Sequence, residues 1–133
     1  MKLPAGKYYV GDLCYVMHNE WDEVCKLTLA DDYLDQGLFK LGNGVRFAML
    51  RTAYGDGCYE DREGREYSVD SGTIGCVKVD DITEDVREDL GNIIEFNTDF
   101  YVSTNGQELR FGHVWIDTNP PYEESYDEEE EDA

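Results

Sequence analysis

The chain has 133 residues and carries 31 Asp and Glu against 11 Lys and Arg, so its formal net charge at pH 7 is −20. This length suits one domain with a single hydrophobic core. A negative field of this size repels phosphate backbones and argues against direct nucleic-acid binding. No apolar stretch approaches the ~20 residues that a membrane-spanning helix requires, so we expect no membrane contact either.

The acidic residues are concentrated at the C-terminal end but are not confined to it. Residues 118–133 hold eight acids and no Lys or Arg, which leaves 23 acids and 11 bases in residues 1–117. We expect residues 1–117 to form a single globular domain and residues 118–133 a disordered acidic tail. The N-terminus shows no secretion signal, which predicts a cytoplasmic protein with four free, mostly buried cysteines.

The first third of the chain alternates β-type runs with one helical pattern. Residues 7–10 predict a strand that ends at a Gly-Asp corner. Asn19 is a candidate N-cap for a helix over residues 20–30, in which Trp21, Val24 and Cys25 share one face.

The middle of the chain predicts a series of short strands. Residues 38–41 and 45–51 are separated by Gly42-Asn43-Gly44, a composition typical of a hairpin turn. Apolar residues on both faces of 45–51 predict a central strand. Residues 66–70 and 73–79 predict two further strands, with Gly75 as a bulge or a point of close approach. The order Asp-Ile-Thr-Glu that begins at Asp81 is typical of a capping box, which predicts a short helix.

The last predicted element is a hairpin around Asn105-Gly106. The alternation on its second arm places His113 on an apolar face beside Phe111 and Trp115. Together the elements predict an α+β fold. It would be a bent, mostly antiparallel sheet or a partly open β-barrel of seven or eight short strands, with one helix and one short helix.

One short motif, Gly-Asp-x-Cys-Tyr, occurs twice, at residues 11–15 and 55–59. Its simplest role is structural, because an Asp after Gly can fix a turn by accepting the N–H two residues on. Alternatively, Asp12 and Asp56 lie side by side and bind a divalent metal ion or share a proton. Cysteine catalysis at Cys14 or Cys58 is disfavoured, because no base or positive neighbour lowers a thiol pKa there.

Two stretches resemble small, largely uncharacterised phage and bacterial proteins. They are GKYYVGDLCYV, which begins at Gly6, and YGDGCY, which begins at Tyr54 and is followed by VDSGTIG. The resemblance covers about the first 80 residues, and this chain departs from the pattern at Leu13, where Pro is frequent. It implies a small accessory protein, encoded by a phage, and assigns no catalytic residue.

The first functional hypothesis is a non-enzymatic protein that binds and modulates or inhibits a host protein with a basic surface. Carboxylates on a rigid face can imitate nucleic-acid phosphates, and no cofactor is expected. The candidate binding residues are acids in three parts of the chain: Asp31, Asp32, Asp35, Glu60, Asp61, Glu63, Glu84, Asp85, Glu88 and Asp89.

The alternative hypotheses concern the second Gly-Asp corner. A nucleotide-type ligand could stack on tyrosines while arginines hold its phosphate. The candidate residues for that site are Arg46, Arg51, Tyr54, Asp56, Tyr59, Arg62 and Arg65. The remaining alternative is a divalent-metal protein or enzyme that uses Asp12 and Asp56.

Overall fold

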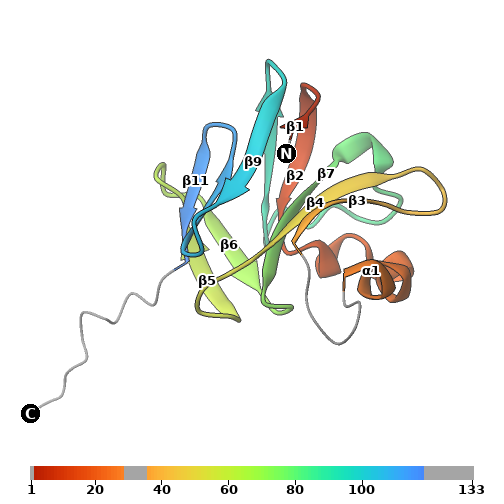
Figure 1. Cartoon of the computed structure of the whole chain (residues 1–133), viewed down its shortest axis with the longest axis horizontal. Helices are drawn as coiled ribbons and strands as arrows, with labels where there is room; N and C mark the ends of the chain where they lie inside the picture. Colours follow the sequence, from red (N-terminus) through yellow and green to blue (C-terminus); the bar gives the residue numbers. More distant parts are fainter. Residues whose placement is uncertain (1, 29–35, 119–133) are drawn as a thin grey trace, which may run out of the picture.

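The computed structural model describes residues 2–28 and 36–118 (Figure 1). These residues form eleven strands, one α-helix and several 3-10 turns, and all strand pairs are antiparallel. The predicted α+β class with bent antiparallel sheets is therefore confirmed. The strands are more numerous than the seven or eight expected, partly because the last predicted strand is split in two.

A five-stranded sheet forms the middle layer. Its strands in spatial order are β3 (Gly37–Lys40), β4 (Arg46–Arg51), β7 (Thr73–Lys78), β2 (Gly6–Gly11) and β8 (Asn92–Phe96). β4 occupies an inner position, as its two apolar faces predicted. The turn before β4 is also confirmed, since the N–H of Leu41 bonds the carbonyl of Val45.

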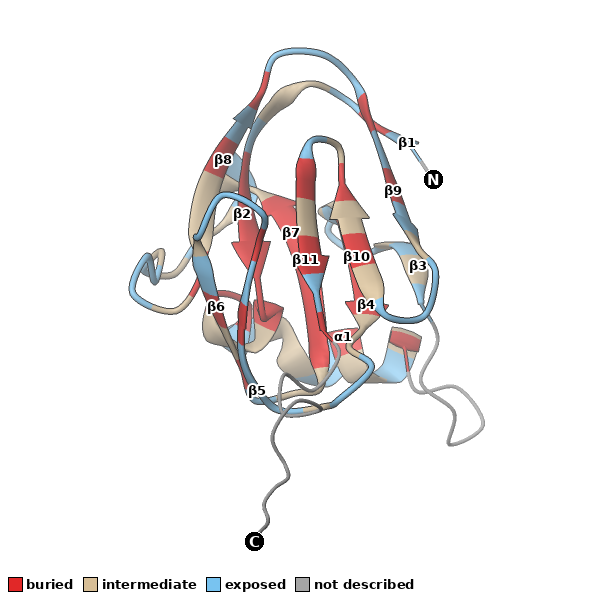
Figure 2. Cartoon of the chain, turned by 90° about the vertical axis from the view of Figure 1, so that its left-hand side faces the viewer, coloured by how far each residue is buried: buried red, intermediate tan, exposed pale blue. Residues whose placement is uncertain are grey.

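A second sheet packs on one face of this layer. It consists of β1 (Lys2–Leu3), β9 (Phe100–Thr104), β10 (Glu108–Phe111) and β11 (Val114–Asp117). The hairpin of β5 (Gly57–Glu60) and β6 (Glu66–Val69) extends it, because Asp61 forms a β-bridge with Ile116. Figure 2 shows the buried positions along β2, β7 and β11. The core between the layers includes Tyr8, Val10, Ala48, Leu50, Tyr67, Phe96, Phe100, Leu109, Phe111 and Ile116.

Helical segments cover the opposite face of the five-stranded sheet. They are η1 (Leu13–Tyr15), η2 (His18–Glu20) and α1 (Trp21–Thr28). A second core forms here from Tyr9, Leu13, Val16, Met17, Val24, Leu41, Phe47, Met49 and Val77. The five-stranded sheet is thus buried on both sides, which explains why β4 has no polar face.

Two helix predictions need correction, and one carboxylate explains both. Asn19 lies inside η2 and does not cap a helix. Residues 82–91 form turns, not the predicted helix, after a 3-10 turn, η4 (Val79–Asp81). The Glu84 carboxylate does not close a local capping box. It accepts hydrogen bonds from the N–H groups of His18 (3.1 Å) and Asn19 (2.7 Å) and so caps η2 instead.

The predicted hairpin at Asn105-Gly106 is present between β9 and β10, but its second arm does not continue as one strand to Trp115. Gly112 has a positive φ of 60°, and Phe111 pairs directly with Val114 in a two-residue hairpin. The turn shifts the alternation, so Val114 and Ile116 are buried while His113 is exposed. His113 consequently leaves the apolar face on which the sequence placed it.

At Gly75 there is no room for a side chain between β7 and β4. A Cβ there would overlap the carbonyl oxygen of Ala48 and would lie 2.9 Å from Leu13 Cδ1. We expect Gly75→Ala to lower the free energy of unfolding by about 3 kcal/mol, measured by urea denaturation, because neither neighbour can move cheaply. The control is Gly42→Ala, where the nearest atom is the mobile end of Glu23 and the expected loss is under ~1 kcal/mol. Equal losses would contradict this account.

Candidate functional site

The Asp12 carboxylate of the first Gly-Asp corner is fully buried and fully hydrogen-bonded. Oδ1 accepts from the Cys14 N–H (3.0 Å) and the Ser71 hydroxyl (2.8 Å). Oδ2 accepts from the N–H groups of Asp70 and Ser71, each at 2.7 Å. The Asx-type turn predicted for this corner is therefore present, and both oxygens of Asp12 are engaged in holding the fold.

The second corner has a different structure from the first. Asp56 is exposed, whereas Tyr59 is buried and its hydroxyl donates to the Gly55 carbonyl (2.7 Å). The same five-residue motif thus ends one strand in a 3-10 turn and begins another strand elsewhere. Within residues 2–28 and 36–118, no group of three or more His, Cys, Asp or Glu side chains has a metal-binding arrangement.

Asp61 and Arg65, predicted for two different binding surfaces, are partners of each other. The Asp61 side chain is 1 % exposed and accepts from Arg65 Nη1 (2.9 Å), the Tyr67 hydroxyl (2.8 Å) and two backbone N–H groups, those of Glu63 and Arg65. Burial by itself raises the pKa of Asp61, but these hydrogen bonds outweigh burial and hold the pKa below its ordinary value. This ion pair, in which Asp61 is buried and Arg65 is half-buried, closes the β5–β6 turn.

The other residues of the predicted ligand site are dispersed. Arg46 begins β4 and Arg51 ends it, so the two lie about 16 Å apart at 3.3 Å per residue. Tyr54 is 58 % exposed. Arg62 turns toward the second sheet and stacks on Trp115, with 3.9 Å between its guanidinium carbon and the ring centroid. The structure therefore gathers no single pocket from the predicted set.

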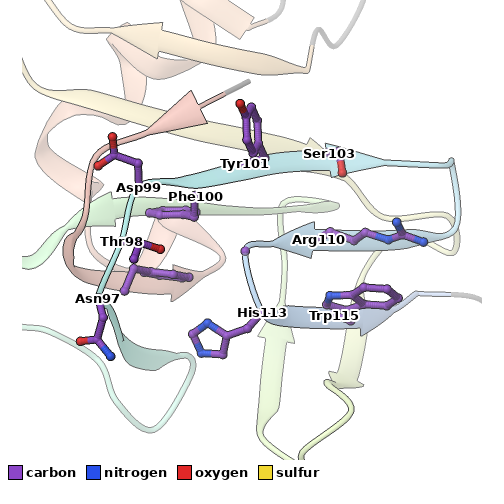
Figure 3. A pocket seen from close by; sticks show the side chains of 11 residues that line it. Asn97, Thr98, Asp99, Phe100, Tyr101, Ser103, Arg110, His113 and Trp115 are labelled. Carbon is purple, nitrogen blue, oxygen red and sulfur yellow. The ribbon is translucent and has the colours of Figure 1, made fainter.

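A hollow on the outer side of the second sheet has no counterpart among the sites that the sequence predicted. Its volume is about 450 Å³, and Tyr101, Arg110, His113 and Trp115 are among the side chains that line it (Figure 3). Arg110 stacks on Trp115 at 4.1 Å. Glu108 pairs with both arginines, at 3.2 Å from Arg62 and 3.5 Å from Arg110. The cations beside Trp115 are thus already neutralised in part by the protein itself.

Acidic residues gather on the helical layer. Residues 18–28 and 79–91 together hold nine acids and two bases, a formal charge of −7, whereas all the described residues hold 20 acids and 11 bases, a charge of −9. We call these two segments the acidic layer. Its acids are Glu20, Asp22, Glu23, Asp80, Asp81, Glu84, Asp85, Glu88 and Asp89. The rest of the described chain is nearly neutral.

The fold brings the two segments of the acidic layer together. Trp21 and Leu27 of α1 pack against the same core cluster as Ile82 and Val86 of the second segment. The two hydrogen bonds from η2 to Glu84 join the segments directly. α1 lies on one side of the five-stranded sheet in Figure 1, and the β5–β6 hairpin lies on the other.

The predicted protein-binding acids are accordingly divided. Glu84, Asp85, Glu88 and Asp89 belong to the acidic layer, although Asp89 pairs with Arg87 at 2.9 Å. Glu60, Asp61 and Glu63 belong to the β5–β6 hairpin, where Asp61 is buried and Glu63 pairs with Arg65. Asp31, Asp32 and Asp35 lie outside the described residues.

The four cysteines are free thiols, as predicted, but only Cys76 is buried, while Cys58 is exposed and the other two are half-buried. Burial, followed by the hydrogen bond and the negative charge of Asp12, raises the pKa of Cys14. This thiol is therefore protonated, and a poor nucleophile, at neutral pH.

Comparisons of the chain with protein-family models, curated proteins and solved structures found no match. No helix in residues 2–28 and 36–118 combines the length and the hydropathy needed to cross a membrane. Function must therefore be inferred from the site geometry.

The Asp61 ion pair makes a pH-dependent contribution to stability. Because the pKa of Asp61 is lowered on folding, its contribution is complete above the unfolded value near ~3.9 and is lost as the pH falls below it. We expect Asp61→Asn to lower the free energy of unfolding by about 2 kcal/mol at pH 7, because an amide cannot accept all the hydrogen bonds that the buried carboxylate accepts and the charge attraction to Arg65 is lost. Urea denaturation at several pH values should show a smaller loss of stability on acidification than in the wild type. The exposed Asp56→Asn is the control, and an unchanged pH slope in Asp61→Asn would contradict the assignment.

Proposed function

We propose that this protein is a non-catalytic accessory protein that docks through its acidic layer on a basic surface of another protein and modulates that protein. The observation that carries the proposal is the position of the charge. Two acidic segments, distant in the sequence, pack against one core cluster and hold −7 of the −9 charges of the described residues. The resemblance to small phage and bacterial proteins supports a host protein, in the host cytoplasm, as the partner.

The layer suits electrostatic docking because packing and hydrogen bonds hold its two segments together. Its apolar residues are packed against the five-stranded sheet, and Glu84 ties the loop to η2. Carboxylates on a fixed backbone need little reordering when they meet Lys and Arg side chains of a partner. The same arrangement can imitate the phosphates that a nucleic-acid-binding surface recognises.

The rest of the sequence adds to the long-range field. Eleven further acids and no base occur in residues 29–35 and 119–133. Charge of this kind raises association rates by steering, and its effect falls within a Debye length of about 8 Å at physiological salt. Binding is therefore expected to weaken steeply as the ionic strength rises.

The docking proposal is tested with two variants that lose the same number of negative charges from different surfaces. The layer variant carries Asp22→Asn, Asp80→Asn, Asp85→Asn and Glu88→Gln, and the control carries Asp56→Asn, Glu60→Gln, Glu66→Gln and Glu95→Gln. All eight side chains are exposed, and both variants lose four negative charges. With a synthetic arginine-rich peptide as probe, we expect the layer variant to bind about tenfold more weakly than the wild type and the control about twofold.

The same proteins then serve as baits in host extract. Partners of the acidic layer should be retained by the wild type and the control and lost by the layer variant. If both variants lose peptide affinity equally, binding reflects net charge alone and the docking assignment is wrong.

A further inference from the structure

Three basic side chains stand next to one another across three strands of the five-stranded sheet. Lys40 of β3 lies opposite Arg46 of β4. Phe47 lies opposite Val77, so Arg46 stands opposite Lys78 at the next position. With strands about 4.8 Å apart, the three residues cover roughly 10 Å. We call Lys40, Arg46 and Lys78 the basic row.

The basic row is not neutralised by the part of the chain that the structure describes. None of its three side chains has a carboxylate within the 4.0 Å of an ion pair there, whereas Arg62, Arg65, Arg87 and Arg110 all have one. Like charges directly opposite one another destabilise a sheet. The chain has almost three acids for each base, so an acidic residue beside the row would be a common way to relieve this repulsion. The row is accessible to a ligand, since Lys40 and Arg46 are exposed and Lys78 is half-buried.

Two hollows adjoin the row and meet at Arg46 and Leu3. One, of about 230 Å³, lies beside Lys78 and Tyr8. The other, of about 220 Å³, lies beside Lys40 and Phe39. It also reaches Lys2, which is already paired with Asp99 at 4.0 Å. Among the residues that line them, Asp81 is the one acid. Each hollow therefore joins positive charge to an apolar or aromatic surface.

We propose that the basic row binds the phosphate group of a small phosphorylated molecule, whose aromatic or apolar part lies in an adjoining hollow against Leu3. Arg46, at the centre, offers the planar fork that matches two phosphate oxygens, and the lysines beside it add two point charges. A phosphate monoester carries about −1.5 to −2 at neutral pH and so gains more from this row than a single carboxylate does.

The size of the ligand follows from the hollows and from the field around them. Each hollow is smaller than the roughly 300–1,000 Å³ typical of sites for drug-sized molecules. The net charge of −20 repels polyanions such as nucleic acids and anionic membranes far more than a ligand with one phosphate. The basic row and the acidic layer have no residue in common, although Asp81 of the acidic layer lines one of the hollows. This proposal and the docking proposal can therefore fail separately.

The test is a titration of the full-length protein with phenyl phosphate, followed by amide NMR shifts. We expect shifts concentrated in residues 38–47 and 76–79 and affinity about tenfold weaker in Arg46→Gln. Lys26→Gln on α1 makes the same change in net charge and should weaken binding less than about twofold. Arg46→Lys keeps the charge but loses the planar fork, so we expect a loss of affinity smaller than that in Arg46→Gln. This variant replaces Arg46→Gln in the test if Arg46→Gln does not fold. Binding should weaken below about pH 6, where the phosphate gains a proton.

Several results would overturn the proposal. Equal weakening in Arg46→Gln and Lys26→Gln would reduce it to net charge, and shifts around Trp115 would place the anion elsewhere. Inorganic phosphate binding as tightly as phenyl phosphate would remove the role of the hollows. Benzoate binding as tightly would remove the preference for a dianion. Tighter binding of a single-stranded oligonucleotide through the same residues would make nucleic acid the ligand.

Discussion

One buried carboxylate connects two parts of this fold that lie 58 residues apart in the sequence. Asp12 follows β2, and three of its four hydrogen bonds hold Asp70 and Ser71, which stand just before β7. The fourth comes from the nearby Cys14 N–H. β2 and β7 are neighbours in the middle of the five-stranded sheet, and both other layers pack on that sheet. A charge can be buried there because its oxygens are all satisfied. By holding the end of β2 to the start of β7, Asp12 therefore supports the sheet against which both cores pack.

Sequence patterns predicted features that depend on neighbouring residues. The two apolar faces of β4, the turn before it and the close approach at Gly75 all follow from a few adjacent positions. Features that depend on distant partners were not predictable. Glu84 belongs to a local capping-box pattern, yet its carboxylate bonds backbone groups 65 and 66 residues away. The turn at Gly112 was hidden because the alternation on either side of it looks continuous.

The candidate sites show the same division. Composition predicted an acidic protein, but the acids that share a surface are decided by the apolar residues beside them, such as Trp21 and Val86. Asp61 stands in a run of charged residues and looks like its neighbours in the sequence, yet it alone turns inward. Lys40 and Lys78 lie on either side of Arg46 because of the strand register. No pattern of neighbouring residues in the sequence indicates that register.

The two tryptophans of this chain lie in different layers, and this gives the molecule two separate optical reporters. Trp21 packs against the core of the helical layer, whereas Trp115 lies between two guanidinium groups on the second sheet. Fluorescence from proteins that retain one tryptophan at a time follows each layer independently. Since local regions of a protein can open at different free energies, such spectra reveal whether the helical layer separates from the sheets before the whole fold is lost.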